Sequence, residues 1–124
     1  MNEPWLSLLV QMKRRYTALN ETYDLTRQMG EALDRNDQTS FSMLLAMRQE
    51  PILRLQELDG NIRRVRESCA PDMQRRWEQL AQGASPLDES EAQLAEQLAR
   101  NKRLIERLVP MDQRIQQVLS AKKA

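Results

Sequence analysis

The side chains that most often carry catalytic or metal chemistry are scarce in this chain. It has no histidine, the commonest general base and metal ligand in proteins. Cys69 is the single cysteine, so neither a disulfide nor a thiolate metal cluster can form within one chain. Because Cys69 ends an apolar run, we expect a small buried side chain rather than a nucleophile. With no glycine-rich phosphate loop either, the sequence predicts no enzyme activity, no cofactor and no metal site.

Charged residues cluster in ways that favour ordinary helix surface. Two carboxylate pairs, Glu31 with Asp34 and Asp88 with Glu91, each share a helix face but have no metal-binding companion. One basic cluster stands out: Arg63, Arg64, Arg66, Arg75 and Arg76. Acidic residues interleave with these arginines, which favours surface ion pairs over nucleic-acid binding. The totals of 19 basic and 18 acidic residues leave no global field that would attract nucleic acid or anionic lipid.

Composition and length favour a single all-α domain spanning residues 1–124. Apolar residues make up 40% of the chain and there are only 3 glycines, which suits long helices with few turns. Leu, Gln, Glu, Arg, Met and Ala dominate, and these residues lose little entropy in a helix. The N-terminal apolar stretch runs directly into Lys13, Arg14 and Arg15, so we expect neither a signal peptide nor a membrane span. A reducing, cytoplasmic location fits this sequence.

Apolar residues at three-four spacing predict two long helices that form an antiparallel hairpin. The first covers about residues 3–35 and ends at Asn36, where Asp37 is a good N-cap for the second. The second carries its apolar stripe to Cys69 and is interrupted by Pro51. Proline removes an amide donor and crowds the preceding turn, so a kink is expected. The alternative is that the helix stops and restarts at Pro51.

A short helix and a third long helix are expected to follow the hairpin. The short helix covers about residues 72–82 and is closed by Gly83. Ser85 as the cap, Pro86 at the first helical position and Asp88 three residues beyond the cap predict the start of the long helix. Its apolar pattern is interrupted by Pro110 and then resumes. The predicted architecture is an elongated antiparallel hairpin with a third long helix laid against it and a short connecting helix between.

Two sequence blocks resemble the FlgN family of flagellar export chaperones, and together they cover about half of the chain. Residues 29–64 contain an alanine-leucine stretch, an acidic turn, paired leucines, a basic residue and a leucine-rich run. In this sequence these are Ala32 and Leu33, Asp37, Leu44 and Leu45, Arg48, and Ile52, Leu55 and Leu58. The segment LARNKRLIERL resembles the family's third helix, with Asn101 as its asparagine. Two departures are Pro51 and Pro110, which fall where the family pattern is unbroken helix.

The resemblance implies a cytoplasmic chaperone that binds the helical terminal region of a flagellar hook-associated subunit. Such a chaperone blocks premature assembly and delivers the subunit to the type III export gate. FliT-type flagellar chaperones have similar size and helicity, so the resemblance extends to them. The alternative, from a different class, is a helical structural or adaptor protein that acts through self-association along its own apolar seams.

We expect the partner surface at the C-terminal end of the last helix. Its residues are Ile105, Leu108, Met111, Ile115, Val118 and Leu119. If Pro110 loosens the connection to the body, residues 111–124 are mobile until a partner orders them, because a segment this short is marginal as an isolated helix. The alternative is that these residues extend the intramolecular seam against the first helix, within reach of Trp5 and Leu9.

Overall fold

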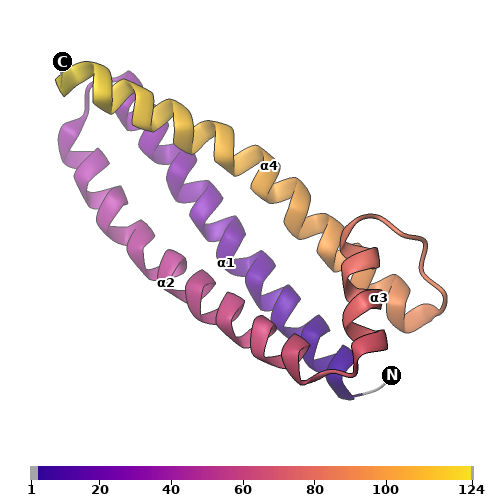
Figure 1. Cartoon of the computed structure of the whole chain (residues 1–124). Coiled ribbons are helices and arrows are strands. Elements are labelled where there is room, and N and C mark those ends of the chain that lie inside the picture. The colour runs from indigo at the N-terminus through magenta and orange to yellow at the C-terminus, as the bar shows by residue number, and fades with distance from the viewer. Residues whose placement is uncertain (1–2, 124) are drawn as a thin grey trace.

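The computed structural model, which describes residues 3–123, contains four helices and no strand in that range. They are α1 (Glu3–Asp34), α2 (Gln38–Ser68), α3 (Pro71–Ala81) and α4 (Glu89–Lys123). α1 lies between α2 and α4 along most of its length, and α3 packs near the end that holds the N-terminus (Figure 1). α2 runs antiparallel to α1, whereas α4 runs parallel to it. The predicted all-α architecture of a long hairpin, a third long helix and a short connecting helix is confirmed.

The reversal between α1 and α2 is built from two local capping arrangements. Asn36 adopts a left-handed conformation (φ 55°) just past the end of α1. The amide of Asp37 donates to the Ala32 carbonyl at 2.8 Å and the amide of Asn36 to the Leu33 carbonyl at 3.1 Å, which closes the last turn of α1. The Asp37 carboxylate then accepts the Ser40 amide at 3.0 Å as the N-cap of α2. The predicted helix end and cap are confirmed.

Both internal prolines lie inside continuous helices. α2 passes through Pro51 without stopping, so the alternative of a restart at this residue is wrong. α4 likewise passes through Pro110, which is exposed. Each proline removes one backbone hydrogen bond from its helix, and the contacts of the helix with α1 maintain the path on both sides. Residues 111–123 are therefore a continuation of α4, and residue 124 lies outside the described residues.

The start of α4 differs from the prediction by one turn. The helix begins at Glu89, and its cap is Asp88, whose Oδ1 accepts the Glu91 amide at 2.8 Å. Ser85 instead lies in the loop, where its carbonyl accepts a hydrogen bond from Arg76 of α3 at 2.6 Å. Gly83 closes α3 as expected: its φ is 99°, and its amide donates to the Leu80 carbonyl at 3.0 Å. A tertiary contact from Arg76 thus overrides the local cap signal at Ser85.

An ion pair between Arg76 and Glu91 joins α3 to the first turn of α4. Arg76 Nε donates to the two carboxylate oxygens of Glu91 at 2.8 and 2.9 Å. The amide of Leu87 also donates to this carboxylate, at 2.9 Å. The hydrogen bond from Arg76 is the main reason that the pKa of Glu91 is lowered, with desolvation acting in the opposite direction. The pair fixes the loop between the two helices.

The buried apolar residues form two separate clusters, one near each end of the molecule. The first combines side chains from all four helices: Trp5, Leu8, Met12, Ile62, Trp77, Leu80 and Leu94. The second lies near the α1–α2 turn: Met29, Ala32, Leu33, Phe41, Leu44 and Ile115. Between these clusters, several buried side chains are polar, and they set the register of the three long helices.

Asn101 is one of these buried polar residues, and it ties α4 to α1. Its side-chain amide donates to the Met12 carbonyl at 3.2 Å and to the Gln97 carbonyl at 2.8 Å. Its carbonyl oxygen accepts from Arg15 Nη1 at 3.1 Å, and Arg15 Nε in turn pairs with Asp59 of α2 at 2.7 Å. Because buried polar groups are costly when unpaired, this network favours one alignment of the helices over slipped ones.

Candidate partner-binding groove

A groove with mainly apolar walls lies between α2 and α4, over the middle of α1. α1 packs against both helices, whereas within residues 3–123 the backbones of α2 and α4 barely approach each other. The groove has a volume of about 430 Å³. We define it by its lining residues, which are Thr22, Arg48, Ile52, Leu55, Leu108, Val109, Asp112 and Gln113.

The floor of the groove is kept low by Thr22 of α1, and Thr26 lies one turn farther along the same helix. Thr22 and Thr26 are buried, and their hydroxyls donate to the carbonyls of Ala18 at 2.8 Å and Thr22 at 2.7 Å. Their hydroxyl protons are therefore satisfied within their own helix, and their methyl groups remain available for packing. A larger residue at position 22 would fill the space between the two walls.

Arg48 crosses one end of the groove and links all three long helices. Its Nη1 donates to Thr26 Oγ1 of α1 at 3.0 Å and to Asp112 Oδ1 of α4 at 2.9 Å. Arg48 is 8% exposed, whereas the Asp112 carboxylate is more than a third exposed. Among the described residues, the buried positive charge of Arg48 is therefore paired with a single carboxylate, which lies at the rim of the groove.

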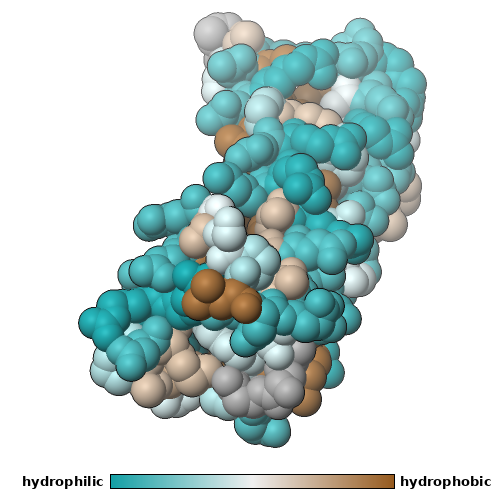
Figure 2. All heavy atoms as spheres, turned by 90° about the vertical axis from the view of Figure 1, so that its right-hand side faces the viewer, coloured by the Kyte–Doolittle hydropathy of each residue, from teal (hydrophilic) through white to brown (hydrophobic). Residues whose placement is uncertain are grey.

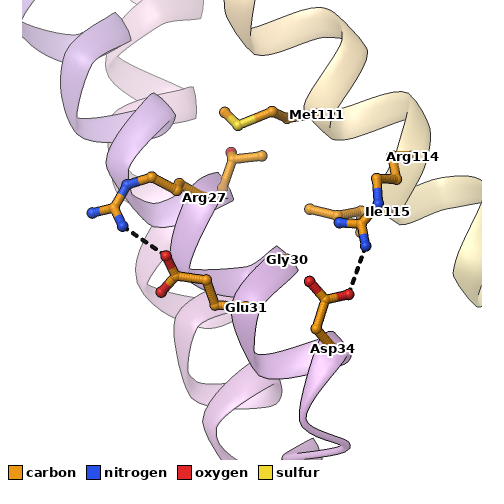
Figure 3. A pocket seen from close by; sticks show the side chains of 8 residues that line it. Arg27, Gly30, Glu31, Asp34, Met111, Arg114 and Ile115 are labelled. Atoms are coloured by element: carbon orange, nitrogen blue, oxygen red, sulfur yellow. Dashed lines mark hydrogen bonds and ion pairs between the residues drawn. The ribbon is translucent and has the colours of Figure 1, made fainter.

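The structure places the six predicted partner residues in different surroundings along α4. Leu108 lines the groove, and Ile105, three residues earlier, is half-buried on the same helix. Met111 and Ile115 point from α4 toward α1, where they line a second, smaller pocket of about 190 Å³ (Figure 3). Ion pairs of Arg27 with Glu31 and of Arg114 with Asp34 flank that pocket.

Ile115 is used within the chain, which corrects its expected exposure to a partner. It is 1% exposed and packs in the second apolar cluster, against which Val118 and Leu119 are also packed. The last turns of α4 thus extend the intramolecular seam, but against the end of α1 and the start of α2. Trp5 and Leu9 lie at the opposite end of α1, so the expected contact with them is wrong. The parallel course of α4 along α1 is the reason. Partner binding at the other five residues stays a prediction.

Three apolar residues of the groove were not assigned to a partner site from the sequence. Ile52 and Leu55 were recognised as part of the leucine-rich run of the family pattern. Val109 was missed, although it lies four residues after Ile105 and therefore shares a helix face with it. Val109 is 44% exposed. The exposure of these positions depends on the separation of α2 from α4, for which the sequence contains no local signal.

Among the described residues outside the groove, four large hydrophobic side chains are more than half exposed; three lie on α2, and the fourth, Leu87, lies in the loop before α4. Met43, Met47 and Leu53 are each more than half exposed. By contrast, the face shown in Figure 2 is mostly hydrophilic, with small and separate hydrophobic patches. A partner that recognises apolar surface has more to contact on α2 and in the groove than on this face.

The remaining candidate sites behave as ordinary helix surface or core. Cys69 is buried, and its thiol donates to the Val65 carbonyl at 3.2 Å. In the basic cluster, Arg66 pairs with Glu78 at 3.8 Å, while Arg75 pairs with Asp72. Among the described residues, no group of three or more metal-ligating side chains is placed to hold a metal. None of the helices described contains a stretch both long and apolar enough to cross a bilayer.

Comparison of the chain with protein-family models, with curated proteins and with solved structures found no match.

Proposed function

We propose that this protein is a cytoplasmic export chaperone that binds a helical terminal segment of a flagellar hook-associated subunit and prevents its premature assembly. The observation that carries the proposal is the groove between α2 and α4. The two other long helices, α2 and α4, surround α1 only in part, and the groove is the position that a further long helix would fill. The resemblance to FlgN-type and FliT-type chaperones supports the identity of the client. The proposed activity is binding alone and requires no catalysis.

The chemistry of the groove suits an amphipathic helix. Ile52 and Leu55 on one wall and Leu108 and Val109 on the other would contact the apolar stripe of such a helix. A subunit that becomes helical on assembly has an unpartnered apolar stripe beforehand. Covering that stripe in the groove would block self-assembly of the subunit until it is released for export.

A binding experiment with one groove variant and one matched variant tests the proposal. The terminal helical segment of a flagellar hook-associated protein is titrated calorimetrically into the wild type, Val109→Asp and Leu53→Asp. Val109 lies in the groove, whereas Leu53 is 61% exposed and is not among the residues that line it. We expect Val109→Asp to weaken binding by about tenfold or more, because it places a charge against an apolar stripe. Leu53→Asp should bind as the wild type does.

Two results would contradict the proposal. One is the absence of binding to the wild type, and the other is equal binding by Val109→Asp and the wild type when both melt at similar temperatures. The thermal melt is needed because it separates lost binding from lost fold.

Self-association is the second candidate function, and the exposed residues of α2 favour it specifically. Met43 and Met47 are four residues apart and therefore lie on one face of the helix. Two copies of the chain could pair through this face, as in a coiled coil. Sedimentation equilibrium of the wild type and of Met43→Glu/Met47→Glu tests this candidate. A dimer that the double variant dissociates supports the adaptor function, and a monomeric wild type at all concentrations excludes it.

A further inference from the structure

The guanidinium group of Arg48 has an edge that the chain itself does not use. Both of its hydrogen bonds, to Thr26 and to Asp112, come from Nη1. Nε is buried and has no hydrogen-bond partner. Arginine presents five N–H donors in a rigid fork, and its Nε–Nη2 edge can hold both oxygens of one carboxylate. Within the described residues, no acceptor contacts that edge.

Such an arrangement is unfavourable in the isolated chain. A buried N–H group without a partner loses its hydration and gains nothing in return. The single carboxylate that does contact Arg48, from Asp112, binds one nitrogen only and lies partly in solvent. A second carboxylate, delivered by a ligand, would complete the hydrogen bonding of the guanidinium and would add an ion pair to a largely buried side chain.

We propose that Arg48 is the anchor for one carboxylate of the helix that occupies the groove. The inference rests on the function proposed above and specifies the partner more closely. Ile52 and Leu55 follow Arg48 by four and seven residues on α2, which is a rise of roughly 6 and 10 Å along the helix axis. The ligand is therefore an amphipathic helix that carries an aspartate or glutamate one to two turns from the apolar residues that contact Ile52 and Leu55.

The groove does not suit a more densely charged ligand. Asp112 lies beside Arg48 at the rim, so closely spaced phosphates of a nucleic acid would meet a negative charge within a Debye length of about 10 Å at 0.1 M salt. Leu108 and Val109 on the same wall offer no donors from their side chains, and Gln113 offers only a neutral amide. One carboxylate on an apolar helix matches both the charge and the walls of this groove.

A double-mutant cycle between the protein and the ligand tests the anchor. The probe is a synthetic peptide of the terminal helix of a flagellar hook-associated protein, in which each acidic residue is replaced in turn by its amide. Binding to the wild-type full chain and to Arg48→Met is measured by calorimetry. For one acidic position, we expect the amide peptide and Arg48→Met each to weaken binding by about 10- to 100-fold. Combining the two changes should weaken it no further.

The matched control is Arg54→Met. Arg54 is on the same helix but lines a different pocket, where it pairs with Glu21 and Glu50. Its substitution should leave peptide binding unchanged. If Arg48→Met fails to fold by circular dichroism, Arg48→Lys replaces it in the cycle. Lysine keeps the charge but lacks the two-donor edge. Arg48→Lys should therefore also weaken binding of the acidic peptide and leave binding of the amide peptide unchanged.

The outcomes separate this inference from the function on which it rests. If the peptide binds the wild type but the two losses multiply at every acidic position, Arg48 is not the anchor, although the groove function stands. Loss of binding in Arg54→Met equal to that in Arg48→Met also overturns the anchor. If the peptide does not bind the wild type, the proposed function fails and the inference fails with it.

Discussion

Substitution of Ile115 by alanine is expected to destabilise the protein strongly. Ile115 is 1% exposed and packs with Met29, Leu33, Phe41 and Leu44. The substitution removes three carbons, and at about 0.8 kcal/mol per buried CH₂ the lost transfer energy alone is about 2.4 kcal/mol. A cavity left among these side chains adds to that loss, since the packed helices relax only in part. The expected decrease in the free energy of unfolding is about 3 kcal/mol.

Urea unfolding followed by far-ultraviolet circular dichroism measures this decrease. Val109→Ala is the matched control, because Val109 lies on the same helix but is largely exposed. It should change the free energy of unfolding by no more than about 1 kcal/mol. A loss below about 1 kcal/mol for Ile115→Ala would refute the reasoning, because it would mean that the last turns of α4 are not docked on the hairpin in solution.

Two further predictions concern α4. The lowered pKa of Glu91 means that its ionised form stabilises the fold above pH 4.5 and that this contribution is lost as the pH falls through the folded-state pKa. Glu91→Gln should therefore be less stable at pH 7 and lose less stability on acidification, whereas equal pH slopes in thermal melts would contradict the role of the Arg76 pair. Pro110→Ala should stabilise the protein by up to about 3 kcal/mol, because an exposed proline inside a continuous helix removes a backbone hydrogen bond without adding packing. An unchanged melting temperature would show that the helix does not continue through residue 110.

The helical hairpin could be predicted because its determinants are local. Asn36 and Asp37 end one helix and cap the next through contacts within five residues, and such contacts can be recognised in a sequence. The start of α4 could not, because Arg76 contacts the Ser85 carbonyl from another helix and the cap moves to Asp88. The cap signal at Ser85 was real but weaker than this tertiary contact.

The candidate site was only partly predictable for a related reason. The apolar periodicity of α4 identifies Leu108 and Ile115 equally, yet the structure places the first in the groove and buries the second. The two residues are seven positions apart and share one face of α4, so the difference between them depends on which parts of α1 and α2 cover that face. Arg48 was recognised as the basic residue of the family pattern, but its unpaired edge follows from the placement of Thr26 and Asp112, which lie 22 and 64 residues away.

The most direct test of the central claim is a methyl chemical-shift map of the full chain with and without the terminal helix of a hook-associated subunit. The methyl groups of Ile52, Leu55, Leu108 and Val109 should shift on binding, while those of Leu53 on the exposed side of α2 should not. Shifts confined to Leu53 and the neighbouring methionines, or no shifts at saturating peptide, would contradict the claim that the groove between α2 and α4 holds the partner.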